Sequence, residues 1–127
     1  MSVVEGLVKS YPGFTLEIPR WEIPDRGITA LWGPSGSGKT TAFRILIGLD
    51  PCSTLRWNFN GEDVAQLPPP DRRFGVVFQT LELFPHMTAE ENILFAARAR
   101  RLRDDEARER LKSLAGDLHL DSCLARK

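Results

Sequence analysis

A glycine-rich octet, GPSGSGKT at residues 33–40, is the feature that most constrains how this chain can fold. A short apolar run, ITALW at residues 28–32, precedes the octet, and the amphipathic pattern TAFRILIGLD follows it. In that pattern Phe43, Leu46 and Ile47 share one helical face. The sequence therefore predicts a strand, a loop and a helix, which is the context that a phosphate-binding loop requires.

The octet matches G-x-x-x-x-G-K-[ST], the pattern of loops that hold nucleotide phosphates. Its glycines let backbone N–H groups approach an anion closely, and the positive end of the following helix adds to the attraction. Lys39 is expected to contact the β- and γ-phosphates and to act in catalysis, while the Thr40 hydroxyl binds Mg2+. The predicted nucleotide-binding residues of this loop are Gly33, Pro34, Ser35, Gly36, Ser37, Gly38, Lys39, Thr40 and Thr41.

The octet alone does not select one class of nucleotide-binding protein. A GTPase would carry D-x-x-G and N-K-x-D downstream, and neither motif occurs in the sequence. A soluble P-loop kinase stays open, because the other motifs of kinases are less regular in sequence. A non-catalytic nucleotide-binding or interaction module also stays open. An ordinary glycine-rich turn is the alternative that needs no nucleotide.

The charge balance and composition exclude several partners. Lys and Arg together number 17, as do Asp and Glu, so no global field favours a nucleic acid or an anionic membrane. No segment approaches the roughly 18 apolar residues of a membrane helix. Cys52 and Cys123 form no C-x-x-C pair, which suits a reducing cytoplasm. We predict a soluble, cytoplasmic chain with no direct membrane insertion and no nucleic-acid partner.

Strand patterns lie on both sides of the octet. SVVEGLVK and FTLEI are separated by Tyr11-Pro12-Gly13, a plausible turn, and predict a small antiparallel layer. STLRWNFNG alternates apolar and polar side chains and closes on Asn60-Gly61, as a half-buried strand and its turn do. FGVVF, at residues 74–78, is the next candidate for a buried strand.

Helical patterns follow Pro85. Thr88 and Glu91 have the spacing of a capping box, which opens the helix AEENILFAARARR. The arginines at the end of this helix are followed at once by acidic residues, so we interpret them as a solvated helix end rather than a nucleic-acid site. A second amphipathic helix starts near Asp104, and its periodic apolar residues are Ala107, Leu111, Leu114, Ala115 and Leu118.

The stretch FGVVFQTLELFPHMTAEENI, residues 74–93, resembles the nucleotide-binding domain of ATP-binding cassette (ABC) transporters. In that family a buried strand ends in a glutamine, here Gln79. A loop close to L-F-P-H-hydrophobic-T follows, here residues 83–88, and then a helix that opens with E-N, here Glu91-Asn92. The preceding LPPPDRRFG is similar to the proline-rich segment found at this place in importer cassettes for sugars, polyamines, metals or oxyanions. The octet and this stretch are two independent motifs in the family's order.

The resemblance implies roles for individual residues. Gln79 would contact Mg2+ or the water near the γ-phosphate, acting in catalysis and metal binding, and would relay the state of the nucleotide to a membrane subunit. Tyr11 stands where the family places an aromatic residue that stacks on adenine, and Phe14 is the competing candidate. His86 lies in the loop before the helix, so we interpret it as structural or as facing a partner.

The implied fold is α/β: a partial P-loop NTPase core with an antiparallel β subdomain and part of a helical subdomain. We predict the antiparallel β region at 1–27, the core with the Gln79 loop at 28–86, and the start of the helical subdomain at 87–127. The implied function is ATP binding by the energy-coupling subunit of an ABC importer, with ATP and Mg2+ as cofactors. The implied partners are a membrane permease subunit and a second nucleotide-binding subunit, at the cytoplasmic face of the membrane.

The family's signature L-S-G-G-Q, its strand ending in Asp-Glu and its switch histidine do not occur in this sequence. The resemblance therefore covers the first half of the family's domain, and we expect this chain to hydrolyse ATP at little more than background. In the family, strands from the other half lie between the octet strand and the Gln79 strand. Without them the sheet edges would be unpaired, so we expect aggregation, exchange of elements between copies, or a requirement for a partner.

Overall fold

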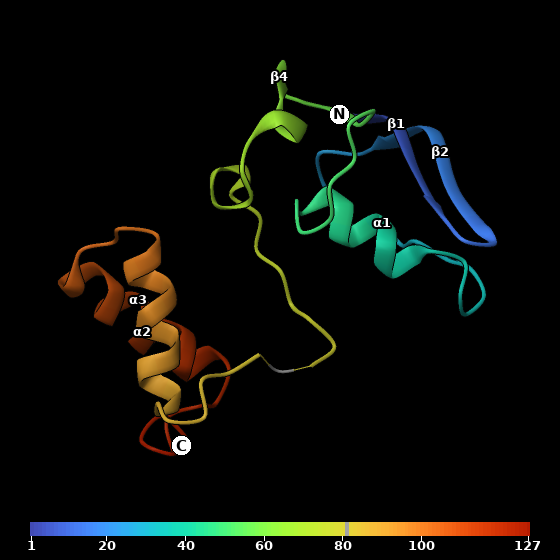
Figure 1. The fold of residues 1–127 in the computed structure, drawn as a ribbon. Coiled ribbons are helices and arrows are strands. Elements are labelled where there is room, and N and C mark those ends of the chain that lie inside the picture. The colour runs from blue at the N-terminus through green and yellow to red at the C-terminus, as the bar shows by residue number, and fades with distance from the viewer. Residues whose placement is uncertain (81) are drawn as a thin grey trace. The chain divides into compact units, whose positions relative to one another are not determined.

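The chain folds into two compact units, as seen in a computed structural model that describes residues 1–80 and 82–127. The units are Met1–Val76 and Val77–Lys127 (Figure 1). Each unit has its own hydrophobic cluster. The first unit contains the sheet, the octet and helix α1 (Lys39–Leu46), whereas the second contains helices α2 (Ala89–Ala99) and α3 (Asp104–Asp117). The boundaries that the sequence predicts at residues 27 and 86 stay predictions.

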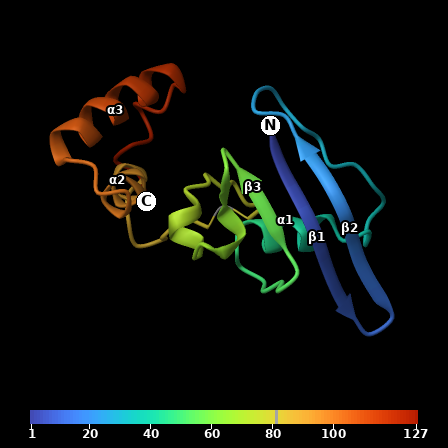
Figure 2. The same cartoon turned by 90° about the horizontal axis from the view of Figure 1, so that it is seen from above.

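Antiparallel strands form the sheet of the first unit, in the order β2-β1-β3-β4 (Figure 2). The two long strands form a hairpin whose register pairs Ser2 with Ile23 at one end and Tyr11 with Phe14 beside the turn. The predicted antiparallel layer and its turn are thereby confirmed. The strands of this sheet are β1 (Ser2–Tyr11), β2 (Phe14–Ile23), β3 (Arg56–Phe59) and β4 (Glu62–Asp63).

Strand β1 buries both Val4 and Leu7 completely, although residues three apart point to opposite faces of a regular strand. Gly6 lies between them with a φ of 62°, and this left-handed residue changes the alternation so that both side chains enter one core. A Cβ on Gly6 would stand 2.7 Å from the carbonyl oxygen of Thr54. Both the backbone conformation and the available space therefore require glycine at this position.

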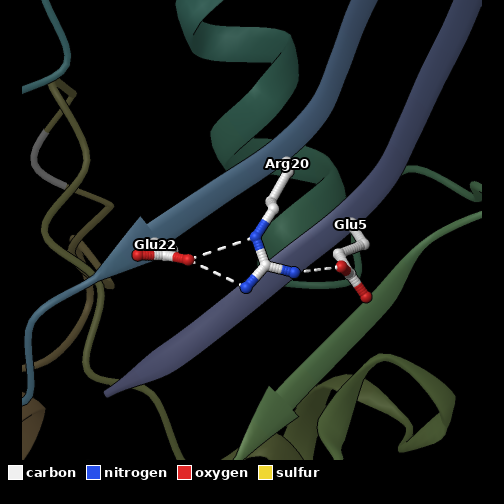
Figure 3. A network of polar contacts seen from close by, with 3 residues as sticks. All are labelled: Glu5, Arg20 and Glu22. Carbon is white, nitrogen blue, oxygen red and sulfur yellow. Dashed lines mark hydrogen bonds and ion pairs between the residues drawn. The ribbon is translucent and has the colours of Figure 1, made fainter.

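An exposed network of ion pairs joins β1 to β2. Arg20 donates from Nε and Nη2 to Glu22 Oε1 at 3.1 and 2.8 Å, and from Nη1 to Glu5, its partner on the opposite strand (Figure 3). The hydrogen bonds to Glu22 and then to Glu5 raise the pKa of Arg20. All three side chains are about half exposed, so solvent screens these pairs and they add little to stability.

Helix α1 (Lys39–Leu46) covers one face of the sheet (Figure 2). Its buried side chains are Ala42, Ile45 and Leu46, whose spacing of three and four residues forms one helical face. The prediction that Phe43 belongs to this face is wrong: the residue is turned by about 100° from Ala42, and half of its side chain is exposed. The core of the unit consists of Val4, Leu7, Leu16, Ala42, Ile45, Leu46, Leu55, Trp57 and Val64.

Strand β3 brings Trp57 into this core, where its Nε1 donates to Ser2 Oγ at 3.2 Å. The predicted turn at Asn60-Gly61 is confirmed, since both residues have positive φ angles, 52° and 86°, and they connect β3 to β4. Asp63 then accepts hydrogen bonds from the backbone N–H groups of Trp57 and Ala65 at 2.9 and 3.1 Å. The Asp63 carboxylate thereby starts a short 3-10 turn that begins directly after β4.

Two apolar runs that the sequence predicts as strands, residues 28–32 and 74–78, are not strands. Ile28 and Val77 are fully exposed, and Trp32 is 96% exposed. No strand among the described residues pairs with either run, and a strand without a neighbour leaves its backbone groups to water. The predictions of strands at residues 28–32 and 74–78 are therefore wrong for this chain. Aggregation of the chain, or exchange of elements between copies, stays a prediction.

Helices α2 (Ala89–Ala99) and α3 (Asp104–Asp117) pack against each other in the second unit. Leu94 of α2 is buried against Ala107 and Leu111 of α3. Two further residues of the predicted apolar stripe, Leu114 and Leu118, are exposed, because they form a row beside the one that Ala107 and Leu111 occupy. Across the described residues, none of the helices combines the length and the apolar character needed to cross a bilayer.

The N-terminus of α2 is closed by two sets of hydrogen bonds. The predicted capping box is confirmed: Thr88 Oγ1 accepts from the Glu91 N–H at 3.2 Å, and Glu91 Oε2 accepts from the Thr88 N–H at 2.7 Å. The next two N–H groups, of Ala89 and Glu90, donate to the carbonyl oxygens of residues 126 and 124 at 2.8 and 3.0 Å. Chain-terminal residues therefore complete a cap that the local sequence begins.

Candidate functional site

The octet forms an irregular loop that leads directly into helix α1. Gly36 and Gly38 have left-handed φ angles of 80° and 91°, and the helix begins at Lys39 with Gly38 as its N-cap. The predicted helix after the octet is confirmed, whereas the predicted strand before it is not formed. The loop therefore owes its shape to contacts with β2 and α1 rather than to a preceding strand.

Gly38 is the point at which the loop meets strand β2. A Cβ on Gly38 would stand 3.1 Å from Leu16 Cδ1 and 3.1 Å from Phe14 Cζ. Those distances are tighter than ordinary van der Waals contacts, and the φ of 91° is one that side chains with a Cβ rarely adopt. The close approach of β2 thus requires glycine immediately before the lysine of the octet.

The ammonium group of Lys39 lies within the loop. Its Nζ donates to the carbonyl oxygens of Gly33 and Pro34 at 2.8 and 2.7 Å and lies 3.5 Å from Ser37 Oγ. The side chain is half-buried, so its positive charge is held beside the backbone of the octet instead of extending into solvent. An anion that enters the loop would meet this charge directly.

Backbone N–H groups at the start of α1 are available to a ligand. Within the loop, the Ser37 N–H donates to Pro34 at 3.3 Å, and the Ala42 N–H donates to Gly38 at 2.8 Å. Across the described chain, the N–H groups of residues 39–41 have no acceptor, and no side chain caps the helix. Free donors, a helix N-terminus and a lysine ammonium together fit the phosphates of a nucleotide.

A hollow of about 300 Å³ opens beside the loop. Its apolar wall comes from Leu16 and Ile18 of β2 and from Ala42 of α1, and Gly33 and Lys39 contribute its polar edge. The loop, the start of α1 and β2 are thus brought together in one unit. In the part of the chain that the structure describes, no three acidic, histidine or cysteine side chains gather where they could hold a metal ion.

The structure places the two aromatic candidates at different distances from the loop. Phe14 lies against Gly38, as the contact distance above shows. Tyr11 is its cross-strand partner at the tip of the hairpin and is 42% exposed, and it interacts electrostatically with Arg44 in the last turn of α1. Tyr11 as the residue that stacks on adenine stays a prediction, and the geometry strengthens the competing candidate Phe14.

Gln79 belongs to the second unit, where it lies in a bend with its side chain exposed. Its predicted contact with Mg2+ or water stays a prediction, as do the roles of Lys39, Thr40 and the other octet residues in binding a nucleotide. The last residue of the octet, Thr40, is exposed, whereas Thr41, which follows the octet, is half-buried.

Asn92 is a residue of the second unit whose role the sequence analysis missed. Its Oδ1 accepts from the Phe84 N–H at 2.8 Å, and its Nδ2 donates to the carbonyl oxygens of Phe84 and Thr88 at 3.2 and 2.9 Å. The side chain therefore folds the loop of residues 83–88 back onto α2. The Glu-Asn pair at the start of the helix was the signal, because an asparagine amide can accept and donate hydrogen bonds at once.

His86 packs within the same loop. Its ring meets that of Phe84 edge to face at 5.9 Å, and Phe84 meets Phe95 of α2 in the same way at 4.9 Å. These contacts support the interpretation of His86 as a structural residue rather than a base.

Comparisons with known proteins agree on one relationship. A family model described as ABC transporter matches residues 16–127. A molybdate/tungstate import ATP-binding protein of Pyrococcus horikoshii is 35% identical over 127 residues, which cover 100% of this chain and 37% of that protein. A sulfate/thiosulfate import ATP-binding protein of Bradyrhizobium diazoefficiens is 42% identical over 123 residues, which cover 93% of this chain and 36% of that protein.

A solved ATP-binding subunit of an ABC transporter has the same arrangement of elements. It superimposes with a TM-score of 0.82 and 28% sequence identity, over 98% of this chain and 52% of that chain. The chain thus spans about half the length of that solved structure and a little over a third of the length of the two relatives.

Proposed function

Because this chain belongs to the ABC transporter family and has part of its α/β P-loop fold, we propose that it binds Mg-ATP within a transporter's energy-coupling subunit. One observation supports this proposal above the others: the lysine ammonium and the free N–H groups of residues 39–41 converge on one glycine loop. The relatives named for import of molybdate or tungstate and of sulfate or thiosulfate support a role in solute import.

Each residue of the site has a distinct task in this proposal. Lys39 exchanges its hydrogen bonds to Gly33 and Pro34 for the β- and γ-phosphates, and the free N–H groups hold the same oxygens. The Thr40 hydroxyl contributes a ligand to Mg2+. Gln79 acts at the γ-phosphate, and Tyr11, or Phe14 in its place, supports the adenine ring.

The bound nucleotide supplies the phosphoanhydride bond whose hydrolysis drives transport. Hydrolysis needs an activated water and preorganised charge at the γ-phosphate, and neither L-S-G-G-Q nor a strand ending in Asp-Glu occurs in this sequence. We therefore propose that this chain alone binds Mg-ATP and hydrolyses it at little more than background. Its partners are a second nucleotide-binding subunit and a membrane permease that meets the loop from Phe84 to Met87 at the cytoplasmic face.

Calorimetry of Mg-ATP binding tests the proposal, with phosphate release followed in the same samples. Lys39→Ala should weaken binding by roughly ten- to a hundredfold, because a hydrogen bond to a charged group contributes about 1.5–3 kcal/mol. Lys112→Ala is the matched control, since it removes one lysine from the exposed surface of α3 and should leave binding unchanged.

Three outcomes would contradict parts of the proposal. No binding by the native chain would overturn the nucleotide site. Robust phosphate release that disappears in Lys39→Ala would overturn the low turnover. Transfer of phosphate to a second soluble substrate, without any permease, would favour a kinase.

A further inference from the structure

Arg72 uses all three nitrogen atoms of its guanidinium group to bind backbone carbonyl oxygens. Its Nη1 donates to Ile45 and Leu46 at 3.2 and 2.6 Å, its Nη2 donates to Ala65 at 2.8 Å, and its Nε donates to Leu67 at 2.9 Å. Burial lowers the pKa of Arg72, against a smaller opposing effect of the Asp63 carboxylate. No motif in the sequence indicates a role for this residue.

The four carbonyl groups come from two segments that are far apart in the sequence. Ile45 and Leu46 end helix α1, where carbonyl groups have no partner inside the helix. Ala65 and Leu67 belong to the chain that follows β4. Arg72 therefore joins the C-terminal end of the helix whose N-terminal end carries the octet to the segment after the sheet.

The hydrogen bonds of Arg72 fix the position of α1 along its axis, which the hydrophobic core does not determine. The core buries Ala42, Ile45 and Leu46, but apolar contact has no direction and allows a helix to shift along its axis. Hydrogen bonds weaken steeply when their geometry changes, so the bonds from Arg72 to Ile45 and Leu46 set the axial position of α1. With eight residues, α1 is too short to be stable alone and depends on such contacts at its ends.

The chain after Arg72 is anchored in the same core. The Phe74 ring stacks on Trp57 with centroids 4.8 Å apart and an interplanar angle of 19°. Arg72 is held by the end of α1, and Phe74 is held by Trp57 of β3. The turn of residues 69–72 is therefore connected both to the sheet and to the end of α1 that Arg72 caps.

We infer that Arg72 is a positioning residue for the phosphate loop: by capping the far end of α1, it holds the octet in the geometry that binds the nucleotide. This role rests on the proposed function. It also implies the converse coupling, because a contact that favours nucleotide binding must itself be strengthened when the nucleotide binds.

Arg72→Lys tests the inference, because lysine keeps the charge but cannot form the planar set of four hydrogen bonds. The dissociation constant of Mg-ATP is measured by calorimetry well below the unfolding temperature, and stability is measured separately. We expect binding to weaken by roughly three- to thirtyfold, the usual range for a residue that acts on a site from a distance. Arg73→Lys is the matched control, because Arg73 is the exposed neighbour of Arg72. This substitution should change the dissociation constant of Mg-ATP less than twofold.

A merely structural role predicts a different pattern. Arg72→Lys would then unfold at a lower temperature, while its folded molecules bound Mg-ATP as tightly as the native chain, and this result would overturn the inference. If the native chain itself does not bind Mg-ATP, the proposed function fails and the positioning role fails with it. If the native chain and Arg72→Lys bind equally, only the positioning role fails.

The native chain provides a second readout in case Arg72→Lys does not fold. The Nε–H resonance of Arg72 is followed by nuclear magnetic resonance while Mg-ATP is added. We expect this signal to shift and its hydrogen exchange to slow, with the Arg73 signal as an internal control that stays in place. An Arg72 signal that does not respond to saturating Mg-ATP would overturn the inference.

Discussion

The β1–β2 hairpin and the run ITALW that follows it are both rich in apolar side chains, yet only the hairpin forms regular structure. Val4 and Leu7 of the hairpin are completely buried, whereas Ile28 and Trp32 of the run are almost completely exposed. Each hairpin strand has ten residues and meets its partner through a two-residue turn. The run at residues 28–32 has no such partner among the described residues.

The difference shows that apolar content marks a potential strand, whereas a nearby partner decides whether it forms. Antiparallel strands can be joined by a tight turn, but parallel strands need a long crossover connection, so their partners lie far away in sequence. The run at 74–78 behaves like the one at 28–32, since it too is irregular and Val77 is fully exposed. Among the described residues, these two runs are therefore the apolar segments that lack the strand partner they would need to form a sheet.

The largest expected effect is a difference in stability between a substitution in the hairpin and one in the run at residues 28–32. Leu7→Ala should lower the free energy of unfolding by about 2–5 kcal/mol, because it leaves a cavity in the core of the first unit. Trp32→Ala removes a larger side chain but should change stability by less than about 0.5 kcal/mol, because that side chain is 96% exposed. Urea unfolding followed by circular dichroism measures both values.

Equal destabilisation by the two variants would break the comparison. It would mean that residues 28–32 are packed in solution, for example by pairing between copies. Repeating the measurement over a range of protein concentrations would then identify such pairing, since association makes stability depend on concentration.

A smaller effect tests the left-handed residue Gly6, which lets both Val4 and Leu7 enter the core. Gly6→Ala should cost more than about 2 kcal/mol, because the left-handed conformation alone costs roughly 1–2 kcal/mol and the new Cβ would meet the carbonyl oxygen of Thr54. Gly13→Ala is the matched control: its φ is 79°, but nothing lies within 4 Å of its Cβ position. The difference between the two urea midpoints isolates the contact with Thr54, and equal midpoints would show that the Thr54 carbonyl group can move away.

Local patterns predicted the parts of the fold that local contacts complete. The turn after Tyr11, the turn at Asn60-Gly61 and the capping box of Thr88 and Glu91 all form as expected, because each needs only a few neighbouring residues. The failures have the opposite cause. Phe43 was grouped with Leu46 and Ile47 on one helical face, yet it is half exposed, because periodicity gives a helix's apolar side but not the direction from which the sheet approaches.

The candidate site divides in the same way. The octet identified the loop, its lysine and the helix that follows, since all of these are adjacent in sequence. The approach of Phe14 to Gly38 and the cap that Arg72 places on α1 join residues about 25 positions apart. No pattern in a single sequence shows which distant side chains meet, so these contacts required the structure.

The smallest expected effect concerns the start of α2, whose capping box of Thr88 and Glu91 the sequence predicted. Thr88→Ala should lower the free energy of unfolding by about 1 kcal/mol, because it removes the side chain that caps the Glu91 N–H.

Glu91→Gln should also destabilise the second unit, because the hydrogen bond from the Thr88 backbone lowers the pKa of Glu91 and so favours its charged form. Chemical unfolding at about pH 7 and about pH 3 measures both variants.

The effect of pH on Glu91→Gln has a definite sign. Because the pKa of Glu91 is lower in the folded chain than in the unfolded one, its charge stabilises the fold above the unfolded pKa, and this contribution is lost as pH falls through the folded pKa. The cost of Glu91→Gln should therefore be largest at neutral pH and shrink in acid. Glu90→Gln removes a neighbouring charge and its exposed ion pair with Arg108 but no capping bond, and an exposed pair is weak, so it should cost less at neutral pH. A cost of Glu91→Gln that is equal at both pH values would show that the hydrogen bond, rather than the charge, holds the start of α2.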